Sequence, residues 1–211
     1  MLIGGSPCQS FSSLGNGKGF DGKSGLFYEY LRLLEEVKPK FFLLENVVMK
    51  KEFKNSISKM LGCEPIEINS NKVSAQKRRR LYWTNLSTCQ PIDAMVHLED
   101  VLGVPDGYKT VTKTSSTDYK QIFKKAGCLT TCCGHPNGIG RTFYINEKFT
   151  GVKPFDYENS KRLTVKDCEI LQTVPVGYTK SVSANQAYKM LGNGWTVDVI
   201  AHIFKGLVGK V

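Results

Sequence analysis

The chain has 211 residues, of which 41% are hydrophobic and 23% charged, an ordinary balance for a globular protein with one good core. No apolar run reaches the roughly 20 residues that a membrane helix needs, and the first residues lack the basic and apolar parts of a signal peptide. The net charge of +10 favours a polyanionic partner such as nucleic acid, although a lysine-rich surface alone would explain it equally well. Seven cysteines without a secretory signal indicate reduced thiols, so we expect a cytoplasmic or nuclear protein that is not secreted.

The first part of the chain alternates between strand and helix patterns. Hydrophobic periodicity and turn residues predict, in chain order, the end of a buried strand at 2–3, a glycine-rich mobile loop at 10–25, a helix at 26–37, a strand buried on both faces at 40–47, a helix at 50–61 and strands at 65–70 and 80–86. Alternation of this kind predicts an α/β fold.

The second part of the chain loses that rhythm. Residues 87–160 are rich in Thr, Ser, Lys and Gly, and they predict a small irregular subdomain with short strands such as 141–146. Helical periodicity returns in the tail. We therefore expect a catalytic α/β part at 1–86, the subdomain at 87–160, and a C-terminal helical segment at 161–211 that returns to the first part.

Cys8 lies just past the end of the first predicted strand, Glu45 lies at the end of FFLLE (41–45) in the second, and one helix lies between the two strands. Strands joined in this way run parallel, so both side chains are expected at the carboxyl edge of the sheet, where open α/β folds place their active sites. A basic cluster, Gln-Lys-Arg-Arg-Arg, follows at 76–80. Structural explanations also exist. A free cysteine is often a small buried hydrophobe, Glu45 could serve the N-terminus of the next helix, and the cluster could be a solvated charge run.

Five motifs resemble, in order, the motifs of the DNA cytosine-5 methyltransferases. They are GGSPCQSFS at 4–12, LLENVV at 43–48, QKRRRLYW at 76–83, RLTVKDCEILQTVP at 162–175 and LGNGWTVDVIAHI at 191–203. The resemblance covers nearly the whole chain. The stretches at 72–86 and 128–134 look most similar to the animal de novo branch.

The resemblance implies an incomplete Rossmann-like α/β sheet with a small irregular target-recognition subdomain, an S-adenosylmethionine cofactor and double-stranded DNA as partner. Cys8 would add as a thiolate to C6 of a cytosine flipped out of the duplex, because C5 alone is a poor nucleophile. Glu45 would contact N3 and the amino group of that base. Arg80, with Arg78 behind it, would hold the base and the catalytic loop.

The resemblance also implies two sets of binding residues. The methyl donor would contact Pro7, Leu26, Asn193, Gly194 and Trp195, although Trp195 could equally be plain core. DNA would contact Ser10, Ser12, Lys18, Gln76, Lys77, Arg79, Thr130, Thr131 and Arg141, although a threonine-rich strand surface is an alternative for the threonines. Zinc would need a second paired cluster beside Cys128, Cys132, Cys133 and His135, so no metal is expected.

The resemblance leaves part of the family's fold without a counterpart. The family begins with a strand and a glycine-containing turn that grip the methionine end of the donor, and acidic residues at the next strand ends hold its ribose and adenine. None of these precedes Ile3. We therefore expect a fragment, one subunit of a split enzyme with a second polypeptide, or a degenerate DNA-binding or regulatory module.

The choice among these possibilities depends on residues 8, 45, 78 and 80. A non-catalytic copy has no chemical need for all four, so their presence favours an enzyme. Methylation of RNA cytosine would use the same chemistry, but the basic 87–160 region fits DNA better.

Overall fold

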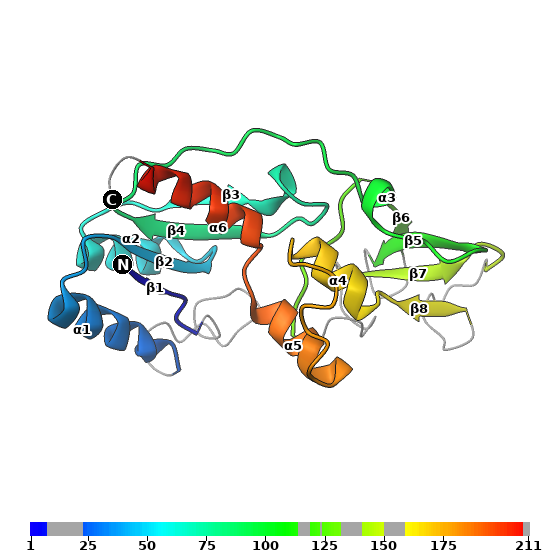
Figure 1. The fold of residues 1–211 in the computed structure, drawn as a ribbon, viewed down its shortest axis with the longest axis horizontal. Helices are drawn as coiled ribbons and strands as arrows, with labels where there is room; N and C mark the ends of the chain where they lie inside the picture. Colours follow the sequence, from blue (N-terminus) through cyan, green and yellow to red (C-terminus); the bar gives the residue numbers. More distant parts are fainter. Residues whose placement is uncertain (8–22, 114–118, 123, 132–140, 150–158, 209–211) are drawn as a thin grey trace. The chain divides into compact units, whose positions relative to one another are not determined.

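The computed structural model describes residues 1–7, 23–113, 119–122, 124–131, 141–149 and 159–208, and its ribbon is drawn in Figure 1. The chain divides into two compact units. Unit 1 comprises Met1–Asn69, Arg79–Gln90 and His202–Val211, and unit 2 comprises Ser70–Arg78 and Pro91–Ala201. These units do not coincide with the expected division at 86 and 160, because residues 70–78 and most of the C-terminal helices pack within unit 2.

Unit 1 is built on a four-stranded sheet with the order β1-β2-β4-β3. Its strands are β1 (Leu2–Gly4), β2 (Phe42–Val47), β3 (Ile66–Asn69) and β4 (Arg79–Thr84). β1 runs parallel to β2, as the sequence predicts for strands joined by a helix, and β4 is antiparallel to both of its neighbours. The α/β prediction for this part of the chain is therefore confirmed.

Two helices of unit 1 bury their apolar sides against this sheet. They are α1 (Phe27–Val37), which follows a 3-10 turn at Lys23–Leu26, and α2 (Lys51–Leu61). Gly62 ends α2 in the left-handed conformation that glycine adopts at little cost. Phe27 and Ile57 share a buried cluster with Trp83 of β4, whose indole N–H donates to the Ser58 hydroxyl.

Unit 2 contains a second four-stranded sheet, which is antiparallel and has the order β6-β5-β7-β8. Its strands are β5 (Tyr108–Lys113), β6 (Tyr119–Gln121), β7 (Thr142–Asn146) and β8 (Ser160–Arg162). The expected subdomain is therefore more regular than its sequence suggests. A strand such as β5 buries Val111 but carries lysines and threonines beside it, and this polar content hides the strand pattern.

The remaining helices are short, and two of them begin with a capping box. They are α3 (Leu98–Val101), α4 (Val165–Leu171), α5 (Ala184–Asn193) and α6 (Val197–Phe204), with 3-10 turns at Ser70–Lys72 and Lys205–Leu207. Thr164 with Asp167, and Ser183 with Gln186, form capping boxes that satisfy the first N–H groups of α4 and α5. In the part of the chain that the structure describes, no helix is both long and apolar enough to cross a bilayer.

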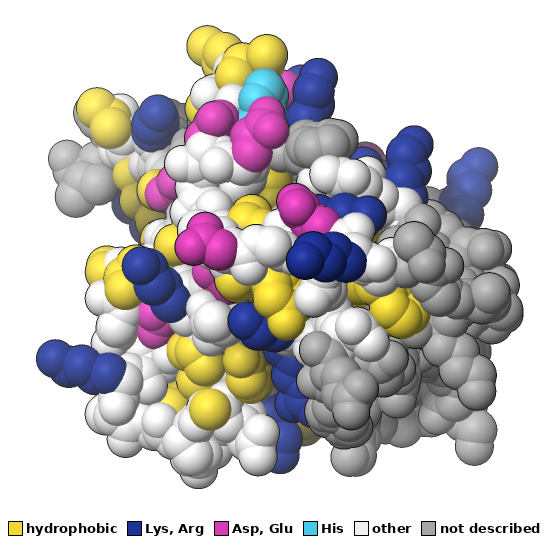
Figure 2. Space-filling view, turned by 90° about the vertical axis from the view of Figure 1, so that its right-hand side faces the viewer, with side chains coloured by type: hydrophobic (Ala, Val, Ile, Leu, Met, Phe, Trp, Pro, Cys, Tyr) yellow, Lys and Arg dark blue, Asp and Glu magenta, His cyan; other side chains and the backbone are white. Residues whose placement is uncertain are grey.

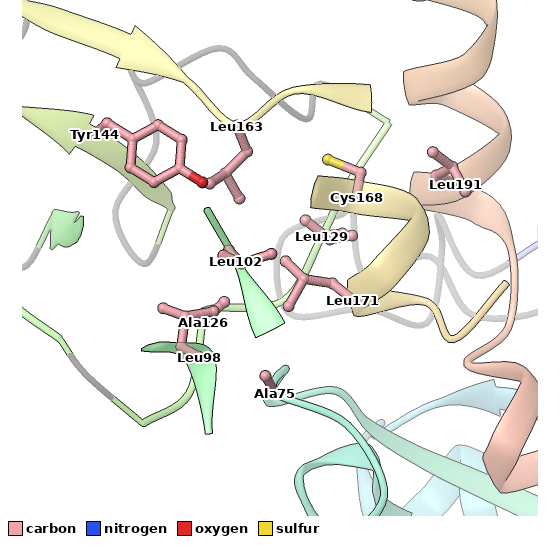
Figure 3. Close-up of a cluster of buried hydrophobic side chains, with 10 residues drawn as sticks. All are labelled: Ala75, Leu98, Leu102, Ala126, Leu129, Tyr144, Leu163, Cys168, Leu171 and Leu191. Carbon is pink, nitrogen blue, oxygen red and sulfur yellow. The ribbon is translucent and has the colours of Figure 1, made fainter. Parts of the chain in front are cut away.

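The core of unit 2 joins segments that are far apart in the sequence (Figure 3). Ala75, Leu98, Leu129, Leu171 and Leu191 all contribute to one buried cluster. Beside it, the Lys125 ammonium donates to the carbonyls of Asn71, Ser74 and Val96, at 2.6, 3.1 and 2.6 Å. Residues 70–78 are thereby fixed to the rest of unit 2.

Candidate active site

Glu45 and Arg80 form an ion pair on one face of the unit 1 sheet. The Arg80 Nε atom lies 2.9 Å from Glu45 Oε1, and both side chains are largely buried, with 15% of Arg80 and 11% of Glu45 exposed. The strand register explains the pairing. Glu45 lies opposite Tyr82, so Arg80, two residues along β4, projects from the same face on the diagonal.

Asn46 ties the end of β2 to the segment that leads out of β1. Its Nδ2 donates to the Ser6 hydroxyl at 3.0 Å and to the Ser6 carbonyl at 3.4 Å, and its Oδ1 accepts from the backbone N–H of Val47. Only 1% of Asn46 is exposed. The structure thus fixes the backbone two residues before Cys8.

The predicted nucleophile itself lies outside the described residues, as do Ser10, Ser12 and Lys18. Of the predicted donor-binding residues in unit 1, Pro7 is half-buried and Leu26 is 55% exposed. β1 is parallel to β2, and its last residue, Gly4, pairs with Leu44. The chain therefore leaves β1 beside Glu45, at the sheet edge where the sequence predicts the site.

The cluster at 76–80 alternates between buried and exposed side chains. Lys77 and Arg79 are exposed, and Arg79 pairs with Glu67 at 2.6 Å. Gln76 and Arg78 are buried, with exposed fractions of 0% and 4%. The alternation follows from extended backbone, in which successive side chains point to opposite sides.

The predicted DNA contact by Gln76 requires correction. Its amide Nε2 donates to the Leu171 carbonyl at 3.0 Å, and its Oε1 accepts from the Leu129 backbone N–H at 2.8 Å. A side chain with no exposed surface and these internal partners cannot reach a phosphate or a base in this structure. Gln76 is therefore part of the interior of unit 2.

Arg78 joins two segments of unit 2. One terminal nitrogen, Nη1, donates to the Leu129 carbonyl at 2.9 Å, and the other, Nη2, donates to the carbonyls of Gly192 and Gly194 at 3.1 and 2.8 Å. The two predicted site arginines, Arg78 and Arg80, thus have different partners in the structure. Arg80 lies on Glu45 in unit 1, whereas the Arg78 guanidinium holds backbone of unit 2 and is placed to position other residues.

The segment that contains Thr130 and Thr131 packs closely against α5 at Gly192, which has no side chain. A Cβ atom on Gly192 would lie 2.2 Å from the Thr130 carbonyl and 2.4 Å from the Thr131 nitrogen. Glycine is therefore required by this backbone approach. Thr130 is half-buried, Thr131 is exposed, and Arg141 lines a small hollow with Thr130 and Cys128.

Trp195 and Gly194 line an apolar pocket of about 270 Å³ in unit 2. Asn193, beside them, is exposed. Among the residues that the structure describes, no charged side chain lines this pocket. Its described lining consists of Gln172, Val174, Tyr178, Thr179, Met190, Leu191, Gly194, Trp195, Val197 and Ile200. Such a surface can accept a flat aromatic or aliphatic group, and it offers few partners to an ionic one.

Two residues that the sequence analysis did not single out have structural importance here. Asn46 directly follows Glu45 in LLENVV, and Gln172 ends the buried run of α4 in a motif already quoted for the resemblance. Both residues could have been found in the sequence as amide side chains within apolar runs, because a buried amide must find hydrogen-bond partners. No described group of three or more His, Cys, Asp or Glu residues could hold a metal ion, and Cys132, Cys133 and His135 lie outside the described part.

Basic side chains are dispersed over the described surface. On the face drawn in Figure 2, Lys and Arg side chains lie at separate places with acidic side chains among them. Lys161 lies 4.1 Å above the ring of Tyr108. The Lys and Arg side chains of this face therefore do not gather into a single patch.

Comparison with known proteins identifies the family. A model of the C-5 cytosine-specific DNA methylase family matches residues 1–63 and 98–209, more than half of the chain. The chain belongs to this family. The cluster at 76–80 falls between the matched segments, so its assignment depends on the motif resemblance described above.

Two curated relatives match over almost the whole chain. One is the Type II methyltransferase M1.ScrFI of Lactococcus lactis subsp. cremoris, 26% identical over 95% of this chain and 60% of the relative. The other is the Type II methyltransferase M.HpaII of Haemophilus parainfluenzae, 26% identical over 100% of this chain and 72% of the relative. The chain thus spans 60% of the length of the first relative. The predicted nearness to the animal de novo branch stays a prediction.

Solved structures confirm the fold. The Entamoeba histolytica methyltransferase EhMeth has a TM-score of 0.68 at 18% identity and covers 99% of this chain and 76% of that one. The S. pombe Dnmt2 methyltransferase has a TM-score of 0.64 at 20% identity and covers 99% of this chain and 78% of that one. The Rossmann-like methyltransferase fold that the motifs imply is therefore confirmed.

Proposed function

We propose that the chain carries the catalytic residues of a DNA cytosine-5 methyltransferase. The buried Glu45–Arg80 pair supports this proposal, because it places a carboxylate and a guanidinium beside the point where the chain leaves β1 toward Cys8. A cytosine presents N3 and an exocyclic amino group that a carboxylate can contact. The arginine supplies the donors and positive charge that keep this carboxylate in place.

In the proposed reaction, the Cys8 thiolate forms a bond to C6 of the flipped cytosine, and the C5–C6 electron pair becomes available at C5. Glu45 would hold the base by accepting from its amino group and, when protonated, would donate to N3, where negative charge develops. Bound S-adenosylmethionine would supply the methyl group, which C5 takes as the sulfonium–methyl bond breaks and S-adenosylhomocysteine leaves. Loss of the C5 proton to a base then restores the double bond and expels the Cys8 thiolate.

The residues around Trp195 fit part of this donor. We propose that the adenine ring lies against Trp195 and the apolar walls of the pocket, with Gly194 allowing close approach. Pro7 and Leu26 of unit 1 would contribute as the motif resemblance implies. The described part of the pocket lining carries no charge, so these residues supply no ionic partner to the ammonium and carboxylate groups of the donor.

We further propose that a separate polypeptide or segment outside residues 1–211 binds these charged groups. It would carry the glycine-containing turn and acidic strand ends of the family. Its apolar strand would pair with β1, which has one neighbour among the described strands and leaves 48% of Ile3 exposed. The DNA substrate would place this activity in the cytoplasm of a prokaryotic cell or in a nucleus.

A covalent trap tests the catalytic proposal. Duplex DNA that carries 5-fluorocytosine cannot lose a proton from C5, so an active enzyme with donor should stay attached to it. The protein should be assayed alone and with a polypeptide that supplies the first three strands of the family. Cys8→Ala should abolish the adduct, and Cys89→Ala, at an exposed free cysteine, should retain it. An adduct that survives Cys8→Ala would refute the assignment.

A further inference from the structure

The amide of Gln172 lies at the centre of a buried hydrogen-bond network in unit 2. Only 1% of this residue and 1% of Thr196 are exposed. Gln172 Nε2 donates to the Leu191 carbonyl and, at 3.2 Å, to the Gly194 carbonyl. Its Oε1 accepts from Thr196 Oγ1 at 2.9 Å and from Gln76 Nε2 at 3.2 Å. Both donors and both acceptor positions of the amide are thus used.

These partners flank Trp195 on both sides. The last residues of α5 and the link at 194–196 lead into α6, and we call them together the 191–196 turn. Gln172 and Arg78 both contact the backbone of this turn. The Gln172 backbone carbonyl also accepts from the Val197 N–H at 3.0 Å. One residue therefore holds the chain both before and after the tryptophan.

Glutamine is the side chain that this position requires. Its amide donates to two carbonyl oxygens and accepts from Thr196 and Gln76. The Gly194 carbonyl also accepts from Arg78 and Gln76 also donates to the Leu171 carbonyl, so the Leu191 carbonyl and the Thr196 hydroxyl depend most on Gln172. A glutamate would place negative charge against the carbonyls of Leu191 and Gly194, and an apolar residue would leave all four groups without this partner. Buried polar groups without partners are destabilising, so the turn would open locally to reach water.

We propose that Gln172 is a positioning residue that holds the 191–196 turn, and with it Trp195, in the conformation that receives the methyl donor. The inference rests on the proposed function for the identity of the ligand. The turn itself is held by Gln172 with or without a ligand. In the proposed reaction, Gln172 does not touch the reacting atoms.

The test compares variants that remove the same kind of bond at different places. Gln172→Met removes the amide with little change in volume. Thr196→Val removes a single bond to that amide, and Thr196→Ser keeps the hydroxyl. Lys125→Met is the matched control, because it removes three buried bonds to carbonyls in the same unit but touches no residue of the turn.

Amide hydrogen exchange of the full chain gives the direct readout. Gln172→Met should accelerate exchange in a peptide covering 190–197 by about tenfold, and Thr196→Val should do so to a smaller extent. Thr196→Ser should restore wild-type exchange. Lys125→Met should accelerate exchange near residues 71–74 and 96 but leave 190–197 unchanged.

Binding of S-adenosylhomocysteine, measured by calorimetry with the complementing polypeptide present, gives the second readout. Gln172→Met should weaken it by about tenfold, while affinity for DNA changes less than about twofold. Unchanged exchange at 190–197 in both Gln172→Met and Thr196→Val would overturn the inference. Faster exchange with unchanged ligand affinity would also overturn it, because the turn would then have no bearing on the donor. If the wild type bound no donor, the proposed function would fail and the exchange data would still decide whether Gln172 holds the turn.

Discussion

Asn46 Nδ2 lies 3.0 Å from the Ser6 hydroxyl, so a buried amide at the end of β2 fixes the chain just before Cys8. We expect Asn46→Ala to slow formation of the 5-fluorocytosine adduct by about tenfold or more, since a small displacement of a nucleophile strongly reduces its rate. The loss of stability should be about 1–2 kcal/mol. Single-turnover rates and urea unfolding measure the two effects.

Asn85→Ala is the matched control for Asn46→Ala. The Asn85 side chain also makes two backbone contacts, to the Lys40 carbonyl and the Phe42 N–H, but at the opposite end of β2. It should lower stability and leave the rate of adduct formation unchanged. Equal rate losses in both variants would show that Asn46 acts only through the stability of unit 1.

The Glu45–Arg80 pair predicts a large chemical effect for a small structural change. Glu45→Gln keeps the size of the side chain and removes its charge, so we expect adduct formation to fall by about 100-fold or more. Glu67→Gln is the control. It removes the carboxylate that pairs with the exposed Arg79, the neighbour of Arg80 on β4, and it should leave the rate unchanged. A Glu45→Gln variant with wild-type kinetics would remove Glu45 from the proposed mechanism.

A methyl group added at Gly192 should lower the stability of the protein, whereas one added at Gly103 should not. Gly192→Ala would drive a methyl group into the Thr130–Thr131 backbone, so α5 or the threonine segment must shift. We expect a loss of about 3 kcal/mol or more, toward the upper end for overpacked cores. Gly103→Ala, where the added atom would meet nothing within 4 Å, should change the free energy of unfolding by less than about 0.5 kcal/mol. Thermal unfolding of both variants is the test.

Glu169 makes the stability of unit 2 depend on pH. Burial raises the pKa of this carboxyl group, but hydrogen bonds from the Thr179 hydroxyl and from the backbone N–H groups of Thr179 and Gly177 outweigh burial, so its pKa is lowered overall. The ionised form is therefore favoured in the folded state. Its stabilisation is complete above the ordinary pKa of glutamate and is lost as the pH falls through the lowered value.

Glu169→Gln tests this dependence. We expect the variant to lose about 1–3 kcal/mol at neutral pH, and the difference from wild type should shrink below about pH 4. Urea unfolding of unit 2 between pH 7 and pH 3 measures it. Glu99→Gln, at an exposed carboxylate of the same unit, should show neither effect. A difference between Glu169→Gln and wild type that stays constant with pH would contradict the argument.

DNA affinity should depend steeply on salt, because the net charge of +10 favours counterion release. Arg141→Glu should weaken binding more than Lys59→Glu, although both variants change the net charge equally. Lys59 belongs to α2, which carries no predicted DNA contact. Filter binding of DNA by the wild type and both variants, between low and physiological salt, measures these affinities. An affinity independent of salt would argue against a DNA-facing role.

The elements of unit 1 could be predicted from the sequence, because each long element has a clear pattern of hydrophobic residues and ends at a clear turn residue. α2, for example, ends at Gly62, as predicted, and β2 is the continuous apolar run that a doubly buried strand requires. The strand–helix–strand order also predicted that Cys8 and Glu45 would lie at the carboxyl edge of the sheet. The structure supports this position for Glu45.

The roles of adjacent residues in the 76–80 cluster were harder to predict. Spacing alone does not say which members face inward, because that depends on partners such as Leu129 and Gly192, which are distant in the sequence. Gln76 was therefore assigned to DNA although it is buried. The antiparallel sheet of unit 2 escaped prediction for a related reason, since its strands are short and their exposed positions are polar.

Lys125 offers a chemical measure of how often unit 2 opens. Burial lowers the pKa of its ammonium group, yet three carbonyls occupy its three N–H donors, so the amine is shielded from reagents while residues 71–74 and 96 surround it. An amine-acylating reagent should modify exposed lysines first and Lys125 only after a transient opening. Once that opening occurs, the burial that lowers this pKa is lost, and Lys125 should react like the exposed lysines. Mass spectrometry of acylated Lys125 over time would therefore report the opening rate without any engineered probe.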